Sequence, residues 1–143
     1  MLMVKIRENK KKLLKAASKA MTNAYVLWGF RVGASVLAED GQIYEGCNVE
    51  SWISGLGTCA ERCAINHAVL HGNRKIKQIA ITVDANSLSE PIPCGACLQY
   101  IFDFAENPKI EIIMAKVEKG RILFETVKLK TIAELLPSPF KNE

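Results

Sequence analysis

The sequence lacks any long uninterrupted hydrophobic run. Its first residues, MLMVKIRENKKKLLK, interrupt apolar side chains with charges, so the apolar core of a secretory signal is missing. Nowhere do apolar residues continue for the roughly 20 positions that a membrane-spanning helix needs. Internal repeats and low-complexity segments are also absent. We therefore expect a cytoplasmic protein without membrane contact, folded as one domain over residues 1–143.

Aromatic residues are few and positive charge is unevenly placed. Aromatic side chains make up 7% of the 143 residues, and the formal net charge is +4. Seven of the 19 Lys and Arg lie in residues 1–20, against Glu8 alone, so the rest of the chain is slightly acidic. This argues against a nucleic-acid partner, because such proteins combine basic surfaces with stacking aromatics. The basic start could touch nucleic acid, but we expect a solvated helix face there.

Five cysteines cannot all pair in disulfides. In a chain without an export signal, metal binding or catalysis is the better interpretation of cysteine.

The hydrophobic pattern predicts an α/β protein. Apolar residues at helical spacing between Val4 and Met21 indicate a basic amphipathic helix within residues 1–23. Residues 30–38 and 43–49 suggest a β-hairpin that turns near Asp40 and Gly41. Further helices are expected over 58–71, 94–106 and 132–136, and further strands over 76–83, 110–117 and 121–129. This order predicts a three-layer α/β/α sandwich with one mixed five-stranded sheet, whose functional groups gather at helix starts beyond the strand ends.

The stretch TCAERCAINHAVLHG, residues 58–72, offers several candidate metal ligands. Cys59, Cys63, His67 and His71 are spaced by four, so adjacent members could share an ion on one helix face. All four cannot converge, because the outer two lie about 18 Å apart along the axis. We expect the two histidines to pack and to cap the last helical turn.

A second set of ligands joins distant segments. PCGAC, residues 93–97, places Cys94 and Cys97 at the separation that lets two thiolates at a helix start bind one tetrahedral Zn²⁺, although a redox pair has the same spacing. Cys59 also opens a helix and could supply a third thiolate. Three protein ligands leave one position open, as a catalytic zinc site requires.

Two residues shortly after Cys59, Glu61 and Arg62, complete the candidate site. Arg62 could donate a hydrogen bond to a thiolate and offset the negative charge of a three-thiolate zinc site. Glu61 is placed to take a proton from water and return it to a leaving group. Alternatively, Glu61 closes a capping box with Thr58. The remaining Cys47 and Cys63 are expected to be small buried hydrophobic residues.

The order of FRVGA, GCNVE, TCAER, PCGAC and LLPSPF resembles the zinc-dependent cytidine deaminase family from about Phe30 to Phe140. The resemblance implies a cytidine deaminase-like fold and a hydrolase that uses Zn²⁺ held by Cys59, Cys94 and Cys97. Glu61 would then move a proton from the attacking water to the departing ammonia.

The same resemblance implies how a nucleoside is bound. Asn48 and Glu50 would hold the ribose hydroxyls, Phe30 would pack on the base, and the Ala60 N–H would face the base carbonyl. In small members of the family the closing phenylalanine reaches a neighbouring subunit's site. Phe140 would therefore be shared within a homotetramer that acts in pyrimidine salvage.

Three departures from the family pattern lie around the expected pocket. Ser51 and Trp52 follow NVE where the family commonly has asparagine, VLWG precedes FRVGA where the family is PYS-like, and Leu98 follows PCGAC where arginine is usual. These departures leave the expected zinc ligands unchanged, but they alter the rim of the pocket and can therefore change which substrate is bound. Blasticidin S deaminases lack the paired Asn and Glu, so the pair favours a nucleoside or deoxynucleoside.

Cytidine or deoxycytidine is accordingly the expected substrate. Two alternatives remain open at this point: deamination of another aminated nucleoside, such as a modified cytosine nucleoside or a blasticidin S-like compound, and a non-catalytic module in which zinc only joins two helices.

Overall fold

The computed structural model describes residues 6–87 and 90–141, and its centre is one five-stranded sheet. The strands are β1 (Val32–Ala38), β2 (Ile43–Cys47), β3 (Ile76–Asp84), β4 (Glu111–Glu118) and β5 (Arg121–Thr131). The helices are α1 (Glu8–Met21), α2 (Ala60–Leu70), α3 (Gly95–Phe104) and α4 (Ile132–Leu135), with a 3₁₀ turn at Ser54–Leu56. In space the strand order is β2-β1-β3-β4-β5.

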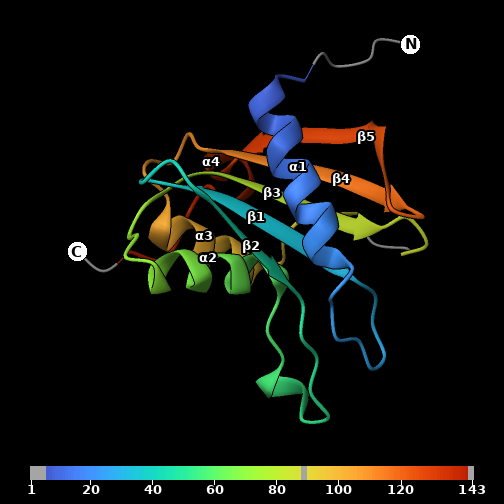
Figure 1. Ribbon diagram of the computed structural model, residues 1–143. Coiled ribbons are helices and arrows are strands. Elements are labelled where there is room, and N and C mark those ends of the chain that lie inside the picture. Colours follow the sequence, from blue (N-terminus) through green and yellow to red (C-terminus); the bar gives the residue numbers. More distant parts are fainter. Residues whose placement is uncertain (1–5, 88–89, 142–143) are drawn as a thin grey trace.

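Helices cover both faces of this sheet (Figure 1). α1 crosses one face, where its buried Leu13, Leu14 and Ala17 pack on Ala80 and Ile113 of the central strands. α2 and α3 lie on the opposite face, over a larger apolar cluster. The three-layer sandwich with a mixed sheet, predicted from the sequence, is confirmed.

The sheet topology brings the starts of α2 and α3 together. β1 runs antiparallel to both β2 and β3, whereas β3 and β4 are parallel. A parallel pair needs a crossover connection, and α3 supplies it on the face that α2 already occupies. Both helices therefore pack side by side on one face.

The segment between β2 and α2 projects away from the sheet, as Figure 1 shows. Its base is held by short backbone ladders: Val49 pairs with Tyr25 on one side and with Thr58 on the other. Residues 25, 49 and 58 are thereby joined although they belong to separate parts of the chain. This arrangement carries residues 48–52 to the same end of the sheet as the start of α2.

Most element boundaries lie within a few residues of those predicted. The hairpin turns at Gly41, whose φ of 83° is left-handed, and Gly72 follows α2 with φ of 91°. α1 begins at Glu8 rather than Val4, and residues 1–5 of the predicted N-terminal helix lie outside the described residues. In the described part of the chain, no helix has the length and apolar character needed to cross a bilayer.

Candidate active site

Three cysteine sulfurs meet where α2 and α3 begin. The Sγ atoms of Cys59, Cys94 and Cys97 all lie within 4.8 Å of one another. Tetrahedral Zn²⁺ with Zn–S distances of about 2.3 Å places its sulfur ligands about 3.8 Å apart, so the cluster fits this ion with small adjustments. Within residues 6–87 and 90–141, no other group of three or more His, Cys, Asp or Glu side chains is arranged to hold a metal.

The local backbone explains how these cysteines are presented. Cys59 and Cys94 occupy the N-cap positions of α2 and α3, with extended backbone angles, and neither makes a side-chain capping bond. Their sulfurs are therefore free to face a shared point. The N–H groups at a helix start carry partial positive charge, which favours thiolates at these two positions.

Arg62 adds a full positive charge to the cluster. Its Nη2 donates a hydrogen bond to Cys59 Sγ at 3.6 Å, as the sequence suggested. Its Nε is buried and has no hydrogen-bond partner in the described part of the chain. Three thiolates bound to one Zn²⁺ would carry a net charge of −1, and this guanidinium offsets it.

Hydrogen bonding separates the acidities of two neighbouring thiols. A hydrogen bond from Cys97, assisted by Arg62, lowers the pKa of Cys59 to about 5. Donating to the Cys59 thiolate, together with burial, raises the pKa of Cys97. Without metal, the pair therefore holds one thiolate on Cys59 and retains the proton on Cys97.

Glu61 lies in the first turn of α2 and is only 5% exposed. Burial is the main cause that raises the pKa of its carboxyl, and the nearby Cys59 thiolate adds to the effect. The capping-box alternative for Glu61 is wrong, because the helix N-cap is Cys59 and no side-chain cap bond forms there. A buried carboxyl with a raised pKa beside candidate metal ligands is suited to proton transfer.

A cavity of about 290 Å³ opens beside these groups. This is near the lower end of the roughly 300–1,000 Å³ typical of small-ligand sites. Its wall includes seven of the residues singled out in the sequence: Phe30, Asn48, Glu50, Cys59, Ala60, Glu61, Cys94. Ala60 is the first residue of α2, so its N–H has no carbonyl acceptor within the helix.

Asn48 and Glu50 are held at the cavity by backbone partners. The Asn48 side chain accepts from the Val32 N–H at 2.8 Å and donates to the Phe30 carbonyl at 2.8 Å. Glu50 accepts N–H bonds from the 27–29 segment. The Asn48 side-chain amide thus anchors the start of β1. The second N–H of that amide and the Oε2 atom of Glu50 remain available to a ligand.

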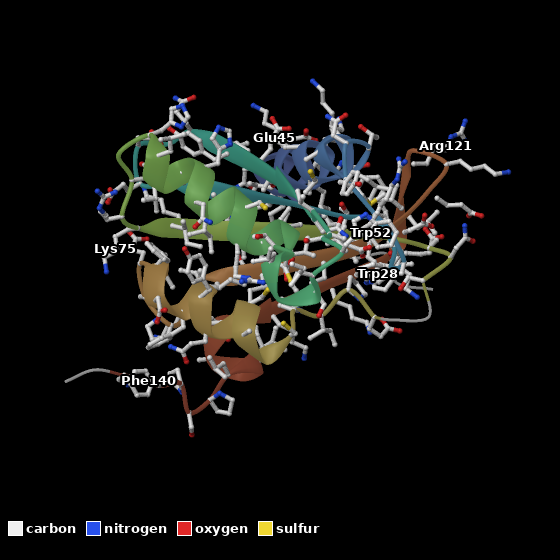
Figure 2. The ribbon with its side chains drawn as sticks, turned by 90° about the horizontal axis from the view of Figure 1, so that it is seen from below. Trp28, Glu45, Trp52, Lys75, Arg121 and Phe140 are labelled. Carbon is white, nitrogen blue, oxygen red and sulfur yellow. The ribbon has the colours of Figure 1, made fainter. Side chains whose placement is uncertain are left out.

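Phe140 lies away from this chain's own cavity. Its ring is 75% exposed, and Figure 2 shows it on the opposite side of the view from Trp28 and Trp52. The Gln99 side chain holds its backbone, accepting from the Phe140 N–H at 2.9 Å and donating to its carbonyl at 3.0 Å. The structure therefore brings together every predicted site residue except this one.

The other candidate ligands have packing roles. His71 Nδ1 donates to the His67 carbonyl in the last turn of α2, and His67 Nδ1 donates to the Glu45 carbonyl. Both rings contact Tyr44. Cys47 and Cys63 are half-buried rather than fully buried as predicted.

Comparison with known proteins bears directly on this geometry. The family described as the cytidine and deoxycytidylate deaminase zinc-binding region matches residues 7–114. The chain belongs to this family. The cytidine deaminase of Sporosarcina psychrophila is 40% identical over 134 residues, which cover 92% of this chain and 91% of that protein. The cytidine deaminase of Halalkalibacterium halodurans is 35% identical, and the match covers 92% of this chain and 93% of that protein.

A solved structure of the family has the same fold. The crystal structure of cytidine deaminase from Burkholderia pseudomallei matches with a TM-score of 0.78 and 31% identity. The match covers 94% of this chain and all of that one. Membership of the deaminase family is therefore supported by sequence and by fold.

Two parts of the site escaped the sequence analysis. The cavity wall also includes Ile81 and Val83 from the end of β3, and Pro91 and Pro93 from the loop before α3. Their position at the end of a buried strand, or in the loop that follows it, was a usable signal, since ligands in α/β sheets bind near strand ends. The second part is the set of hydrogen bonds from the backbone N–H groups of residues 27–29 to Glu50, which no sequence pattern predicts.

Proposed function

We propose that this chain catalyses the hydrolytic deamination of cytidine or deoxycytidine to uridine or deoxyuridine plus ammonia. The observation that carries the proposal is the meeting of three cysteine sulfurs with the buried Glu61 carboxyl at one nucleoside-sized cavity. The 35–40% identity to proteins named cytidine deaminase supports it.

Cys59, Cys94 and Cys97 would hold the zinc ion. Sulfur is a donor that zinc prefers, and in the described residues no fourth protein ligand joins the three. When bound, the ion would supply a Lewis acid that activates water for attack on the cytosine ring carbon that bears the amino group. Arg62 would stabilise the Cys59 thiolate through the bond that is already present.

Glu61 would carry the proton through the reaction. Because burial raises its pKa, the carboxylate is a stronger proton acceptor than an exposed glutamate and can take a proton from the attacking water. It would then pass protons to the ring nitrogen and to the amino group, which leaves as ammonia. Water and the cytosine nucleoside are consumed, and a uracil nucleoside and ammonia are formed.

The remaining cavity residues would bind the nucleoside. Phe30 would pack on the base and the Ala60 N–H would donate to its carbonyl, while Asn48 and Glu50 would hold the sugar hydroxyls. Phe140, which is exposed and distant from its own cavity, would complete the site of a neighbouring chain in a homotetramer. We further propose a cytoplasmic enzyme of pyrimidine salvage, folded as one domain over residues 1–143.

The test compares wild-type protein with Glu61→Gln, both loaded with zinc. Wild-type protein should convert cytidine to uridine, followed by ultraviolet absorbance. The variant should bind zinc stoichiometrically but lose at least about 1,000-fold in kcat, because the proton carrier is gone while the three sulfurs remain. Zinc-loaded wild-type protein that is inert on both cytidine and deoxycytidine would reject the proposal. Equal turnover by the variant would show that Glu61 does not carry the proton, whereas a wild type that binds zinc but is inert would leave the non-catalytic zinc module.

A second candidate keeps the chemistry and changes the substrate to a modified cytosine nucleoside. The observation that favours it is the altered rim of the cavity, where VLWG precedes the lining residue Phe30 and Ser51 follows the lining residue Glu50. The same absorbance assay with base-substituted cytidines distinguishes the two candidates.

A further inference from the structure

Glu50 receives three hydrogen bonds on a single carboxylate oxygen. The backbone N–H groups of Leu27, Trp28 and Gly29 donate to Glu50 Oε1 at 2.6, 2.9 and 3.3 Å. These consecutive amides form a concave anion site of the kind that successive N–H groups build in turns. They fix one oxygen of the carboxylate and leave Oε2 to accept from a ligand.

Gly29 is required for this close approach. A Cβ built on Gly29 would overlap Glu50 Oε2, and the two residues line the same cavity. Any side chain at position 29 would therefore displace the free oxygen, while the amide cluster around Oε1 could remain. The glycine gives Oε2 its position in the cavity wall.

The two tryptophans join the chain segments that form this cluster. The rings of Trp28 and Trp52 meet edge to face, with centroids 5.5 Å apart and planes at 61°. They are 56% and 77% exposed, and Figure 2 shows them side by side. Trp28 supplies the middle one of the three amides, and Trp52 follows Glu50 by two residues. Their contact therefore holds the amide segment against the segment that carries the carboxylate.

The two tryptophan side chains lie outside the wall of the cavity. Among the described residues that line the cavity, neither indole occurs, whereas Gly29 and Glu50 both do. The Glu50 N–H donates to the Tyr25 carbonyl at 2.8 Å, which holds the main chain at the same place. The ring pair adds a side-chain tie to this backbone tie.

We propose that Gly29, Trp28 and Trp52 are positioning residues that present Glu50 Oε2 as the acceptor for a sugar hydroxyl. This deepens the proposed function and rests on it for the nature of the ligand. The geometry makes recognition depend on a hydroxyl donor, because the oxygen presented is a carboxylate acceptor held in one orientation. A ligand whose sugar lacks such hydroxyls cannot donate a hydrogen bond to Glu50 Oε2.

The experiment measures ligand binding by calorimetry, with uridine and 2′,3′-dideoxyuridine as probes and zinc-loaded protein. Trp52→Ala and Gly29→Ala should each weaken uridine binding about tenfold and leave dideoxyuridine binding within about twofold, because only the former ligand reaches Glu50. Trp52→Phe keeps an aromatic ring and should retain most of the uridine affinity. With cytidine as substrate, Trp52→Ala should raise KM about tenfold and leave kcat within about twofold.

Leu56→Ala is the matched control, since Leu56 is a large apolar side chain that is 67% exposed on the same projecting segment. It should bind both probes like the wild type. Equal weakening of both probes in Trp52→Ala and Gly29→Ala, or no weakening of either, would overturn the positioning role. If the wild type fails to deaminate cytidine but shows the binding pattern above, the proposed activity falls and the positioning role stands.

Discussion

At the scale of single residues, the cysteine cluster makes a thiol unusually acidic. Cys97 and Arg62 both donate hydrogen bonds to the Cys59 sulfur. In the zinc-free protein, Cys59 should therefore ionise with a pKa of about 5 rather than near 9. A titration of thiolate absorbance in the zinc-free protein measures this. As pH rises, the first thiolate should form far below the range of ordinary thiols.

Two variants assign that shift to its causes. Cys97→Ala should raise the pKa of Cys59 more than Arg62→Gln does, because the Cys97 bond is the larger cause. Cys59→Ser should abolish the low-pH step. A low-pH step that persists in Cys59→Ser would show that another group, not this thiol, is the acidic one.

The contrast between the metal ligands and Glu50 shows what a sequence reveals at this scale. Cys94 and Cys97 were predictable because two cysteines at this spacing at a helix start can bring both thiolates to one zinc ion. The three amides on Glu50 were not, because they come from main-chain N–H groups that every residue type carries. Trp28 and Gly29 were visible as departures, but the structure was needed to show their contacts.

At the scale of elements, the start of α2 is fixed by how closely that helix approaches β2. A Cβ on Gly46 would overlap backbone atoms of Ala60 and Ala64 in α2. Gly33 is the counterpart on the other face, where a Cβ would overlap the Ala17 carbonyl of α1. These two glycines therefore set the separations of α2 and α1 from the sheet.

Gly46→Ala and Gly33→Ala form a matched pair. Both should destabilise the fold by about 3 kcal/mol in urea unfolding, because backbone cannot yield to the added methyl group. Gly46→Ala should also weaken zinc binding, measured by competition with a chelator, since α2 carries Cys59 and Glu61. Gly33→Ala should leave zinc affinity near the wild-type value. Equal losses of zinc affinity would contradict this division of roles.

Element identities could be predicted because the strands are strongly apolar and their turns contain glycine at left-handed positions such as Gly41. Helix starts were less exact. The predicted helices over 58–71 and 94–106 begin at Ala60 and Gly95, because their N-caps are cysteines that make no capping bond. A true capping box does occur between Thr131 and Glu134 at α4, where the sequence reads Thr-Ile-Ala-Glu.

At the scale of the whole molecule, the exposed Phe140 ring and its distance from the chain's own cavity bear on assembly. In the proposed homotetramer, a working site takes Glu61 from one chain and Phe140 from another. Glu61→Gln and Phe140→Ala preparations should each have little activity on cytidine. Subunits exchanged by mild denaturation and refolding should recover part of it, because some hybrid sites contain both intact residues.

The mixing experiment has a direct control. Mixing Glu61→Gln with Glu61→Asn should recover nothing, since every site lacks the carboxylate. Light scattering of the wild-type protein should give the mass of four chains of 15.8 kDa. A monomer that is fully active would contradict the shared site.

The crossover that carries α3 also sets an order of events during synthesis. Cys59 emerges from the ribosome before β3, and Cys94 and Cys97 emerge only after it, so the nascent chain cannot assemble all three sulfurs until the crossover has been translated. The pairing of β3 with β1 can already form by then, since both strands precede α3. Capture of the ion is thus tied to a stage of translation at which β1, β2 and β3 have already been made, whereas β4 and β5 have still to follow α3.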